Sequence, residues 1–414
     1  EFARCDIRHI LTRHEQSAAH MADGFGRVSR KPGVCFATSG PGATNILTGI
    51  ATAQADSSPM IAVTGQVPVA MIGKDAFQES DIIGMANPVV KYAFQPRLPE
   101  DVPEAVRKGF YIAETGRPGP VLIDVPKDVQ QNEAPMEFPE EFKIQGYHPW
   151  YDPDIVACEK AIDMLLNSEK PIILAGGGTI ISSAFAELQS IAETLMLPVV
   201  TTFKGKGAFP ENHPLSLGPI GMHGHAEANK MMAEADCVLA IGTRFSDRSV
   251  GTFEAFEKRL KIIHMDVDPA EIGKNQTTSL AVVGDVRTSL RVMVKLLLQK
   301  SIKKNEESLW VKHVKETKAY WKENLKLHPG EMGAAKILRK LRELLPKESI
   351  VTTEVGQHQM WASLFYDVIQ PGTFFSSTGL GTMGWGFPAS IGAKVARPDV
   401  PVVDIAGDGS FSMT

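Results

Sequence analysis

The sequence ends in GDGSFSMT, which places one carboxylate, Asp408, between Gly407 and Gly409 directly after the apolar run PVVDIA. Hard cations prefer oxygen ligands, so Asp408 is the obvious candidate ligand in this loop. Glycines on both sides let a diphosphate approach the backbone, because no side chain stands in its way. The pattern predicts a loop that binds a phosphate group together with a metal ion.

Two more glycine-rich stretches precede this loop, EVGQHQMW at residues 354–361 and STGLGTMGWGFPASIGA at residues 377–393. Both are expected to follow strands, and both carry few charges. Met383 in the second stretch could equally fill an ordinary hydrophobic core.

An acidic residue near the start of the chain, Glu15 in RHEQ, lies between a strand expected at residues 7–12 and a helix. A carboxylate at a helix start is stabilised by the helix dipole, which is sufficient reason for its presence. A buried acid at a strand end can also exchange protons with a ligand. The residues alone leave both interpretations open.

Two loops that follow expected strands also combine groups suited to binding. SGPGATN at residues 39–45 comes before a helix, where backbone N–H groups can reach an anionic or polar ligand, although a tight turn explains it as well. It is neither a Walker A motif nor GxGxxG. DAFQE places Phe77 beside Gln78, a pair that suits a small carbonyl substrate or simple loop packing.

The middle of the chain contains GGGT, GMHGH, GTRFSDR and DVDPAEIG. Glycine-rich loops after strands, with an acid at the end of a later strand, follow the general logic of dinucleotide binding, but the spacing is not the GxGxxG fingerprint. His223 and His225 have no further ligands at metal spacing, so zinc is not predicted.

Short β-branched runs such as PIILAGGG and DCVLAIGTR alternate with helical stretches expected at residues 17–29, 103–114, 184–195 and 332–344. Apolar runs without alternation are typical of strands buried on both faces of a parallel sheet. The fold class predicted is therefore α/β, with doubly wound parallel-sheet domains.

Two interruptions, a proline- and aromatic-rich segment at residues 132–153 and a charged helical segment at residues 300–329, divide the chain. We therefore expect three domains, at residues 1–131, 155–298 and 332–414. The third is too short to close a doubly wound sheet.

The bulk composition excludes several functional classes. The chain has 414 residues, a net charge of −5 and 43% hydrophobic residues, which argues against a nucleic-acid or anionic-membrane partner. Four scattered cysteines argue against a disulfide framework and favour a reducing compartment. No signal or transit peptide is visible, and the chain begins without methionine inside a structured pattern, so it is expected to be truncated there.

Ten motifs occur together in one order: RHEQ, SGPGATN, DAFQE, GRPGPVLIDVPKD, GMHG, GTRFSDR, DPAEIGKN, GQHQMW, GLGTMG and GDGSF. The sequence resembles the thiamine-diphosphate-dependent enzymes, and most closely the acetohydroxyacid synthase (acetolactate synthase) catalytic-subunit family. The resemblance covers nearly the whole chain. It implies pyrimidine-binding, central FAD-type and diphosphate-binding domains, with the first and last incomplete in this chain.

The resemblance also assigns residues to thiamine diphosphate. Glu15 matches the acid that hydrogen-bonds the aminopyrimidine, Met383 the residue beneath the bent cofactor, and Asp408 a Mg²⁺ ligand. The full set expected around thiamine diphosphate is Gly40, Gly42, Asn45, Gly356, Gln357, His358, Gly381, Met383, Gly407, Gly409 and Ser410.

The implied reaction decarboxylates pyruvate and transfers the two-carbon unit to a second 2-keto acid. Pyruvate as acceptor gives 2-acetolactate and 2-ketobutyrate gives 2-aceto-2-hydroxybutyrate, in the biosynthesis of valine, leucine and isoleucine. Phe77, Gln78 and Lys127 match substrate-side positions. Arg248 matches an arginine near the acceptor carboxylate, a task that suits the fork of donors on a guanidinium.

The middle domain resembles the family's FAD-binding domain, in which the flavin has a structural role. Ser246 departs from the family's usual FDDR pattern and removes one carboxylate. The residues expected around FAD are Arg117, Gly177, Gly178, Met222, His223, Gly242, Arg244, Asp247, Arg248, Asp266 and Asp285.

In this family the cofactor lies between two subunits, so a homodimer or homotetramer is implied, together with a small regulatory subunit as a further partner. A prokaryotic cytoplasm, a plastid or a mitochondrion is the expected location. The alternatives are another thiamine-diphosphate 2-keto-acid decarboxylase or oxidase, the FAD-free acetolactate synthase, and a non-catalytic fragment. We expect this chain, if truncated at both ends, to be inactive alone.

Overall fold

The computed structural model describes residues 4, 6–135, 137–138, 142–149, 152–250, 260–304, 307–327 and 329–414. The chain divides into two compact units. Unit 1 comprises Glu1–Tyr147, Thr352–Val355 and Ser377–Thr414, and unit 2 comprises His148–Val351 and Gly356–Ser376. Each unit therefore combines segments that lie far apart in the sequence.

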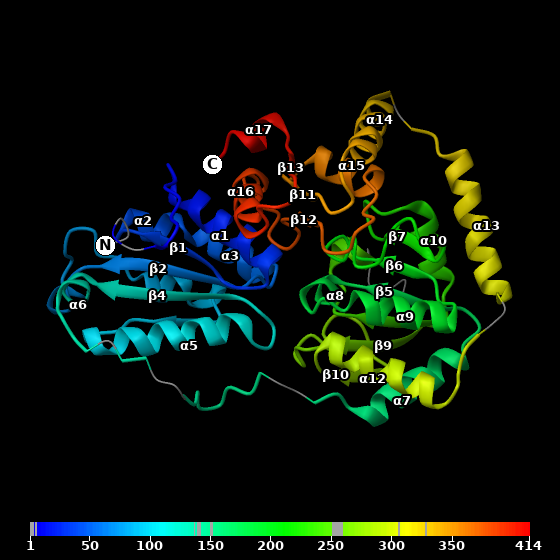
Figure 1. Ribbon diagram of the computed structural model, residues 1–414, viewed down its shortest axis with the longest axis horizontal. Helices are drawn as coiled ribbons and strands as arrows, with labels where there is room; N and C mark the ends of the chain where they lie inside the picture. Colours follow the sequence, from blue (N-terminus) through cyan, green and yellow to red (C-terminus); the bar gives the residue numbers. More distant parts are fainter. Residues whose placement is uncertain are drawn as a thin grey trace. The chain divides into compact units, whose positions relative to one another are not determined.

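Unit 1 is built on a parallel sheet with the strand order β1-β2-β4-β3 (Figure 1). Its strands are β1 (Gly33–Ala37), β2 (Met60–Gln66), β3 (Tyr92–Phe94) and β4 (Pro120–Pro126). Its helices are α1 (Glu15–Ser29), α2 (Pro41–Asn45), α3 (Leu47–Ala55), α4 (Ile82–Ala86), α5 (Val102–Glu114), α6 (Lys127–Gln131), α16 (Gly386–Ala396) and α17 (Asp408–Phe411), with short 3₁₀ turns at Val69–Met71, Asn87–Val89 and Pro99–Asp101.

Unit 2 contains a six-stranded parallel sheet with the order β10-β9-β8-β5-β6-β7. Its strands are β5 (Pro171–Ala175), β6 (Val199–Thr201), β7 (Ser216–Pro219), β8 (Cys237–Ile241), β9 (Lys261–Asp266) and β10 (Leu280–Val283). Its helices are α7 (Ile155–Leu166), α8 (Gly177–Ile181), α9 (Phe185–Leu195), α10 (Ala226–Glu234), α11 (Asp247–Val250), α12 (Val286–Gln299), α13 (Leu309–Asn324), α14 (Pro329–Leu344) and α15 (Gln357–Phe365).

The remaining strands are β11 (Ile350–Thr353), β12 (Phe374–Ser376) and β13 (Val402–Ile405), which pair in the order β12-β11-β13. Helices and strands alternate throughout, so the α/β class predicted from the sequence is confirmed. The domain bounds at residues 1–131, 155–298 and 332–414 stay a prediction.

The central strands are buried from end to end, as their unbroken apolar runs predict. Every residue of β4 is buried, including the acidic Asp124. Burial raises the pKa of this carboxyl, while hydrogen bonds donated by Thr64, Gln95 and Gln66 oppose the rise. The carboxyl thus joins neighbouring segments of unit 1 through side-chain hydrogen bonds.

Helices α1 and α16 pack closely within unit 1 (Figure 1). Two glycines make this approach possible. A Cβ on Gly24 would lie 2.3 Å from the carbonyl oxygen of Ala389, and one on Gly392 would lie 2.0 Å from that of Met21. Backbone therefore meets backbone, and neither glycine leaves room for a side chain.

One expected element is absent. Residues 7–12 form no strand, and Leu11 is 85% exposed. Apolar β-branched residues suggested a strand here, but a strand requires a hydrogen-bonding neighbour, and in the described sheet β1 pairs only with β2. The expected helices are present, and α1 starts at Glu15, where the His14 side chain accepts a hydrogen bond from the Gln16 amide.

Both interrupting segments contribute to the cores of their units. Tyr147 hydrogen-bonds Thr115 and lies beside the ring of Tyr111, so the described part of the first segment packs on α5. Trp310 on α13 is buried in unit 2 and donates to the Pro171 carbonyl. Cys5 lies outside the described residues, whereas Cys35, Cys158 and Cys237 are buried free thiols.

Substituting Gly392→Ala should lower the free energy of unfolding of unit 1 by about 1–3 kcal/mol, because the added methyl group overpacks a backbone contact. Gly333→Ala is the matched control, since a Cβ there meets nothing within 4 Å and Gly333 lies exposed within α14. That control should be neutral or stabilise by roughly 0.5–1 kcal/mol. Thermal melts of both variants test this; equal melting temperatures would contradict the packing argument.

Candidate functional site

Glu15 and the glycine-rich loop at residues 39–45 come together in unit 1. Asn45 Nδ2 donates to Glu15 Oε2 at 3.1 Å. A Cβ on Gly42 would lie 3.4 Å from Glu15 Oε1 and 2.7 Å from a methyl carbon of Thr38, so only glycine fits beside the carboxylate. The loop therefore places the Asn45 side chain and the backbone of Gly42 beside the acid.

The pKa of Glu15 lies below its ordinary value, chiefly because Asn45 donates to the carboxylate and its own backbone amide assists. Partial burial acts in the opposite direction. Without a ligand, Glu15 is thus an ionised acceptor at neutral pH. A ligand that offers a hydrogen-bond donor or a protonated nitrogen would match it.

The DAFQE loop lies against the same glycine-rich loop. Gly40 has φ +64°, and a Cβ on it would lie 2.9 Å from Cβ of Gln78, which itself has φ +62°. Gln78 is thereby brought to the loop that surrounds Glu15. Phe77 is 90% exposed, so it is available to contact a ligand or another protein surface.

Lys127 lies in a groove of about 620 Å³ beyond the carboxyl ends of β1, β2 and β4. Thr38 and Ser39, at the start of the glycine-rich loop, also line this groove, so the groove adjoins that loop. Most of its other lining residues are apolar. Ligands of open α/β sheets bind at this edge. The structure thus gathers Glu15, Gly40, Gly42, Asn45 and Gln78, with Lys127 in the adjoining groove.

The glycine-rich segments at the C-terminal end form a second group in unit 1, organised by Glu354. This carboxylate is fully buried. It accepts from the Gly384 amide at 2.7 Å, the Phe387 amide at 2.9 Å and the Ser410 hydroxyl at 2.9 Å. One side chain therefore joins the Met383 loop, the start of α16 and the GDGS loop.

The surface of this group is open where a ligand is expected. A Cβ on Gly381 or Gly409 would meet no atom within 4 Å, and Met383 is 40% exposed. Asp408 starts α17, follows Gly407 and is exposed. Two bare glycines beside a carboxylate fit a diphosphate with a cation, although among the described residues no three His, Cys, Asp or Glu side chains cluster to hold a metal.

Three further thiamine diphosphate candidates belong to unit 2. Gly356 precedes α15, and Gln357 and His358 form its first turn. A Cβ on Gly356 would lie 2.9 Å from the His358 ring, so a side chain at position 356 would collide with that ring where it now lies. Their placement beside Asp408 stays a prediction.

The FAD candidates of unit 2 lie at the carboxyl edge of its sheet. Strand order reverses between β5 and β8, and at this point Gly178 N donates to Gly242 O at 2.9 Å. Gly242 has φ +56°, and a Cβ on it would lie 2.5 Å from Gly178 Cα. Such a switch point without side chains is where dinucleotides bind in doubly wound sheets.

Other FAD candidates cluster nearby in sequence and space. The Met222 amide donates to the Arg248 carbonyl at 3.2 Å, and the Arg248 guanidinium approaches the Met222 sulfur at 3.7 Å. Burial and then the charge of Arg248 lower the pKa of His223. Asp247 starts α11 beside Arg248, and the Arg244 carbonyl accepts from Asn275.

The acidic FAD candidates Asp266 and Asp285 accept hydrogen bonds from backbone amides of unit 2. Asp266 ends β9 and accepts from the Asp268 amide at 2.9 Å, and Asp285 caps α12 by accepting from the Thr288 amide at 2.9 Å. Arg117 lies in unit 1, where its Nε donates to Ser57. The structure therefore brings Gly178 together with Gly242, and Met222 together with Arg248.

Two buried hydroxyls in unit 2 could form hydrogen bonds with a polar ligand. Thr179 Oγ1 follows the triple glycine and Thr201 Oγ1 ends β6, and neither has a hydrogen-bond partner among the described residues. Buried hydroxyls are usually paired, so a polar ligand or water would satisfy them. The residues present are compatible with a dinucleotide at this edge.

Sequence reasoning missed Glu354, although it belongs to the quoted EVGQHQMW motif. A carboxylate directly before glycine at a strand end is the signal that would have suggested it. It also missed Asp56, whose partners follow it by more than 300 residues.

Family models match three parts of the chain. Residues 1–85 match the thiamine pyrophosphate enzyme N-terminal TPP binding domain, residues 158–293 the central domain, and residues 354–414 the C-terminal TPP binding domain. The probable acetolactate synthase large subunit of Methanocaldococcus jannaschii is 49% identical over 99% of this chain and 70% of its own length. The chain belongs to the acetolactate synthase large-subunit family.

Relatives in other organisms also match nearly the whole of this chain. The acetolactate synthase large subunit of Corynebacterium glutamicum is 43% identical over all of this chain and 66% of its own length. The acetolactate synthase isozyme 3 large subunit of Escherichia coli is 40% identical over 98% of this chain and 72% of its own length. The family resemblance stated from the motifs is confirmed. No helix in the described part of the chain is long and apolar enough to cross a membrane.

Within the acetolactate synthase fold of this chain, a second carboxyl lies close to Glu354. Burial, and then the charge of Glu354, raise the pKa of Asp404 to about 7, while a hydrogen bond from Thr352 at 2.9 Å opposes the rise. Asp404 Oδ2 has no partner among the described residues. Two neighbouring acids beneath the GDGS loop therefore favour a proton on one of them.

Asp404→Asn should stabilise unit 1 at pH 8 but not at pH 4. The folded state keeps a proton on Asp404 up to about pH 7, whereas the unfolded chain loses it near the ordinary value of 3.8. Stability therefore falls as pH rises from 4 to 7, and asparagine removes this loss. The expected gain at pH 8 is about 1–3 kcal/mol, reduced for partial exposure.

Thermal melts of the protein in EDTA, without cofactors, measure this effect. Asp399→Asn is the control, because Arg397 lowers the pKa of exposed Asp399 to about 2 and this group should not titrate between pH 4 and 8. A gain from Asp404→Asn that is equal at pH 4 and pH 8 would refute the assignment.

Proposed function

We propose that the protein is the catalytic subunit of an acetolactate synthase. It decarboxylates pyruvate and joins the two-carbon unit to pyruvate or 2-ketobutyrate, giving 2-acetolactate or 2-aceto-2-hydroxybutyrate for valine, leucine and isoleucine. The observation that carries the proposal is the contact of Glu15 with Asn45 and Gly42, in a chain 49% identical to a probable acetolactate synthase large subunit.

Thiamine diphosphate, when bound, supplies the carbon nucleophile and the electron sink that make loss of CO₂ from a 2-keto acid feasible. The chain's own contribution on the pyrimidine side is Glu15, which holds or releases a proton at its carboxylate. Asn45 fixes the orientation of that carboxylate, and Gly42 places only backbone beside it. Gln78, beside Gly40, and Lys127, in the adjoining groove, would contact the keto acid.

Four residues of the C-terminal group would hold the diphosphate and the cation. Asp408 would bind Mg²⁺, which in nucleotide and cofactor sites takes one or two carboxylates plus phosphate oxygens. Gly407 and Gly409 keep side chains away from the diphosphate. Ser410 is fixed by Glu354 and is thereby positioned at the start of α17.

The Met383 loop would support the other face of the cofactor. Met383 is partly exposed beside the open Gly381, so its side chain is available to a bound ring system. Gly356, Gln357 and His358 complete the proposed thiamine diphosphate set.

Unit 2 would bind FAD. The Gly178–Gly242 backbone contact lies at the switch point of the sheet, where dinucleotides bind. The hydroxyls of Thr179 and Thr201, which have no partner among the described residues, would hydrogen-bond polar groups of the dinucleotide. Met222, His223 and Arg248 would lie on its outer side. Ser246 stands where the family has an acid, so the loop would hold the flavin with Asp247 as its remaining carboxylate.

The assembly proposed is a homodimer or homotetramer in which the active site lies between subunits. Relatives are named as large subunits, which supports a small regulatory subunit as an additional partner.

Glu15→Gln should reduce acetolactate formation at least 100-fold, because glutamine keeps the hydrogen bond from Asn45 but cannot exchange a proton. The measurement is the initial rate of acetolactate formation from pyruvate by the full-length protein with thiamine diphosphate, Mg²⁺ and FAD. Glu114→Gln, at the exposed end of α5, serves as control and should retain the parental rate. A Glu15→Gln protein with more than a tenth of that rate would remove Glu15 from the mechanism.

Purified protein should show flavin absorbance, and Arg248→Ala should weaken FAD binding about tenfold by removing a cation beside Met222 and His223. Arg287→Ala is the matched control, because Arg287 pairs with Glu187 on the surface of unit 2. Titration of FAD into flavin-free protein measures both affinities. Protein that binds no flavin would instead support the FAD-free acetolactate synthase.

A further inference from the structure

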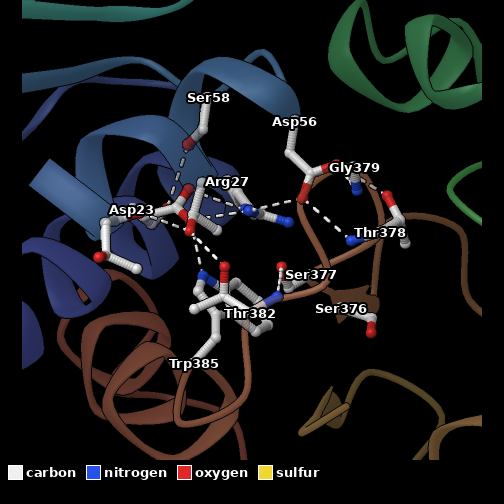
Figure 2. A network of polar contacts seen from close by, with 12 residues as sticks. Asp23, Arg27, Asp56, Ser58, Ser376, Ser377, Thr378, Gly379, Thr382 and Trp385 are labelled. Atoms are coloured by element: carbon white, nitrogen blue, oxygen red, sulfur yellow. Dashed lines mark hydrogen bonds and ion pairs between the residues drawn. The ribbon is translucent and has the colours of Figure 1, made fainter. Parts of the chain in front are cut away.

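Asp56 is a buried acid that directly follows α3, and it holds the loop leading to Met383 (Figure 2). Its side chain is fully buried. Oδ1 accepts from the Thr378 hydroxyl at 2.7 Å and from the Gly379 amide at 3.0 Å, and Oδ2 accepts from the Thr378 amide at 3.1 Å. One carboxylate thereby binds two successive backbone amides of the loop.

Arg27 provides the counter-charge for this acid. Figure 2 shows its guanidinium between Asp23 and Asp56. It donates to Asp23 at 2.8 and 2.7 Å and to Asp56 at 3.0 Å. Burial lowers the pKa of Arg27, but the two carboxylates more than offset this and raise it above the ordinary value. Arg27 therefore stays charged.

Asp23 and Trp385 hold this guanidinium in place. The Trp385 indole donates to Asp23 Oδ2 at 2.6 Å, and the Arg27 guanidinium carbon lies 4.3 Å from the centre of the Trp385 ring. Contact between α1 and α16 is thus maintained by Asp23, Arg27 and Trp385. Asp56 pairs with the same guanidinium and also accepts hydrogen bonds from the loop.

The far end of the loop is fixed as well. The Thr382 amide donates to Ser377 Oγ at 2.9 Å, and the hydroxyls of Thr382 and Thr52 lie 2.7 Å apart. Immediately after Met383, the Gly384 amide donates to Glu354. Between these anchors, Gly381 and Met383 remain accessible to a ligand.

We propose that Asp56, charged against Arg27, is a positioning residue that pre-forms the Thr378–Met383 loop for thiamine diphosphate. This inference rests on the proposed function. A loop that is already ordered loses less conformational entropy on binding, so the anchor should increase cofactor affinity and leave the chemical step unchanged. Buried ion pairs contribute little net stability compared with apolar contacts, which favours a role in defining loop geometry.

The test compares Thr378→Val with Thr378→Ser in otherwise unchanged protein. Valine has the shape of threonine but removes the hydroxyl that donates to Asp56, whereas serine keeps it. Hydrogen–deuterium exchange of the peptide spanning residues 377–384 is measured first, without cofactor. Exchange should be about tenfold faster in Thr378→Val and unchanged in Thr378→Ser, with exchange in α1 unaffected in both.

Cofactor binding is then measured by titration of thiamine diphosphate with Mg²⁺. Thr378→Val should raise its Kd, and its apparent KM in acetolactate formation, about five- to tenfold, while kcat at saturating cofactor stays within twofold. Thr378→Ser should restore both constants to the parental values. Asp56→Asn should show a larger effect of the same kind wherever it folds.

Two results would overturn the inference: faster loop exchange with an unchanged Kd, or equal falls in kcat and melting temperature with no change in Kd and KM. The first would mean that the anchor orders the loop without serving the cofactor, and the second that it serves stability alone. Full-length protein that binds thiamine diphosphate but makes no acetolactate would instead refute the proposed function, and the exchange and Kd results would still decide the role of Asp56.

Discussion

The buried pairing of Arg27 with Asp23 and Asp56 is the constraint on which unit 1 depends. A guanidinium removed from water must find carboxylates, since an unpaired buried charge is strongly unfavourable. Its partners come from α1, from the end of α3 and, through Trp385 and Thr378, from the segment that includes α16. The glycine contacts of α1 with α16 are compatible with this pairing because they allow the two backbones to approach. Charge pairing and close packing therefore select the same arrangement.

The candidate ligand site of unit 2 is built from different contacts than those of unit 1. At its switch point, Gly178 and Gly242 meet without side chains, and the surrounding charged groups lie at the edge of the sheet. In unit 1 buried carboxylates, Glu354 and Asp56, orient backbone amides around the open loops. Glycine allows close backbone approach in both units, and in unit 1 the buried acids Glu354 and Asp56 hold the loops that border the open glycines.

The sequence predicts the α/β class from its unbroken apolar runs. The proximity of Glu15 to the SGPGATN loop is implied only by the family resemblance, since no strand precedes Glu15 among the described residues. The sequence does not reveal Asp56 as an anchor, since the loop residues Thr378 and Gly379 that bind it lie more than 300 positions further along the chain. The strand expected at residues 7–12 is wrong because propensity cannot supply a neighbouring strand. Asp285 shows the converse difficulty: it was selected as a flavin ligand, and its visible contact is a helix cap.

The separation of 322 residues between Asp56 and Thr378 has a consequence during synthesis. At 5–20 residues per second, roughly 16–64 s pass between the emergence of these two residues from the ribosome. Throughout that interval Arg27 lacks Trp385, and the glycine-lined face of α1 has no helix to cover it. The packing of α1 on α16 can therefore form only after most of unit 2 has been synthesised.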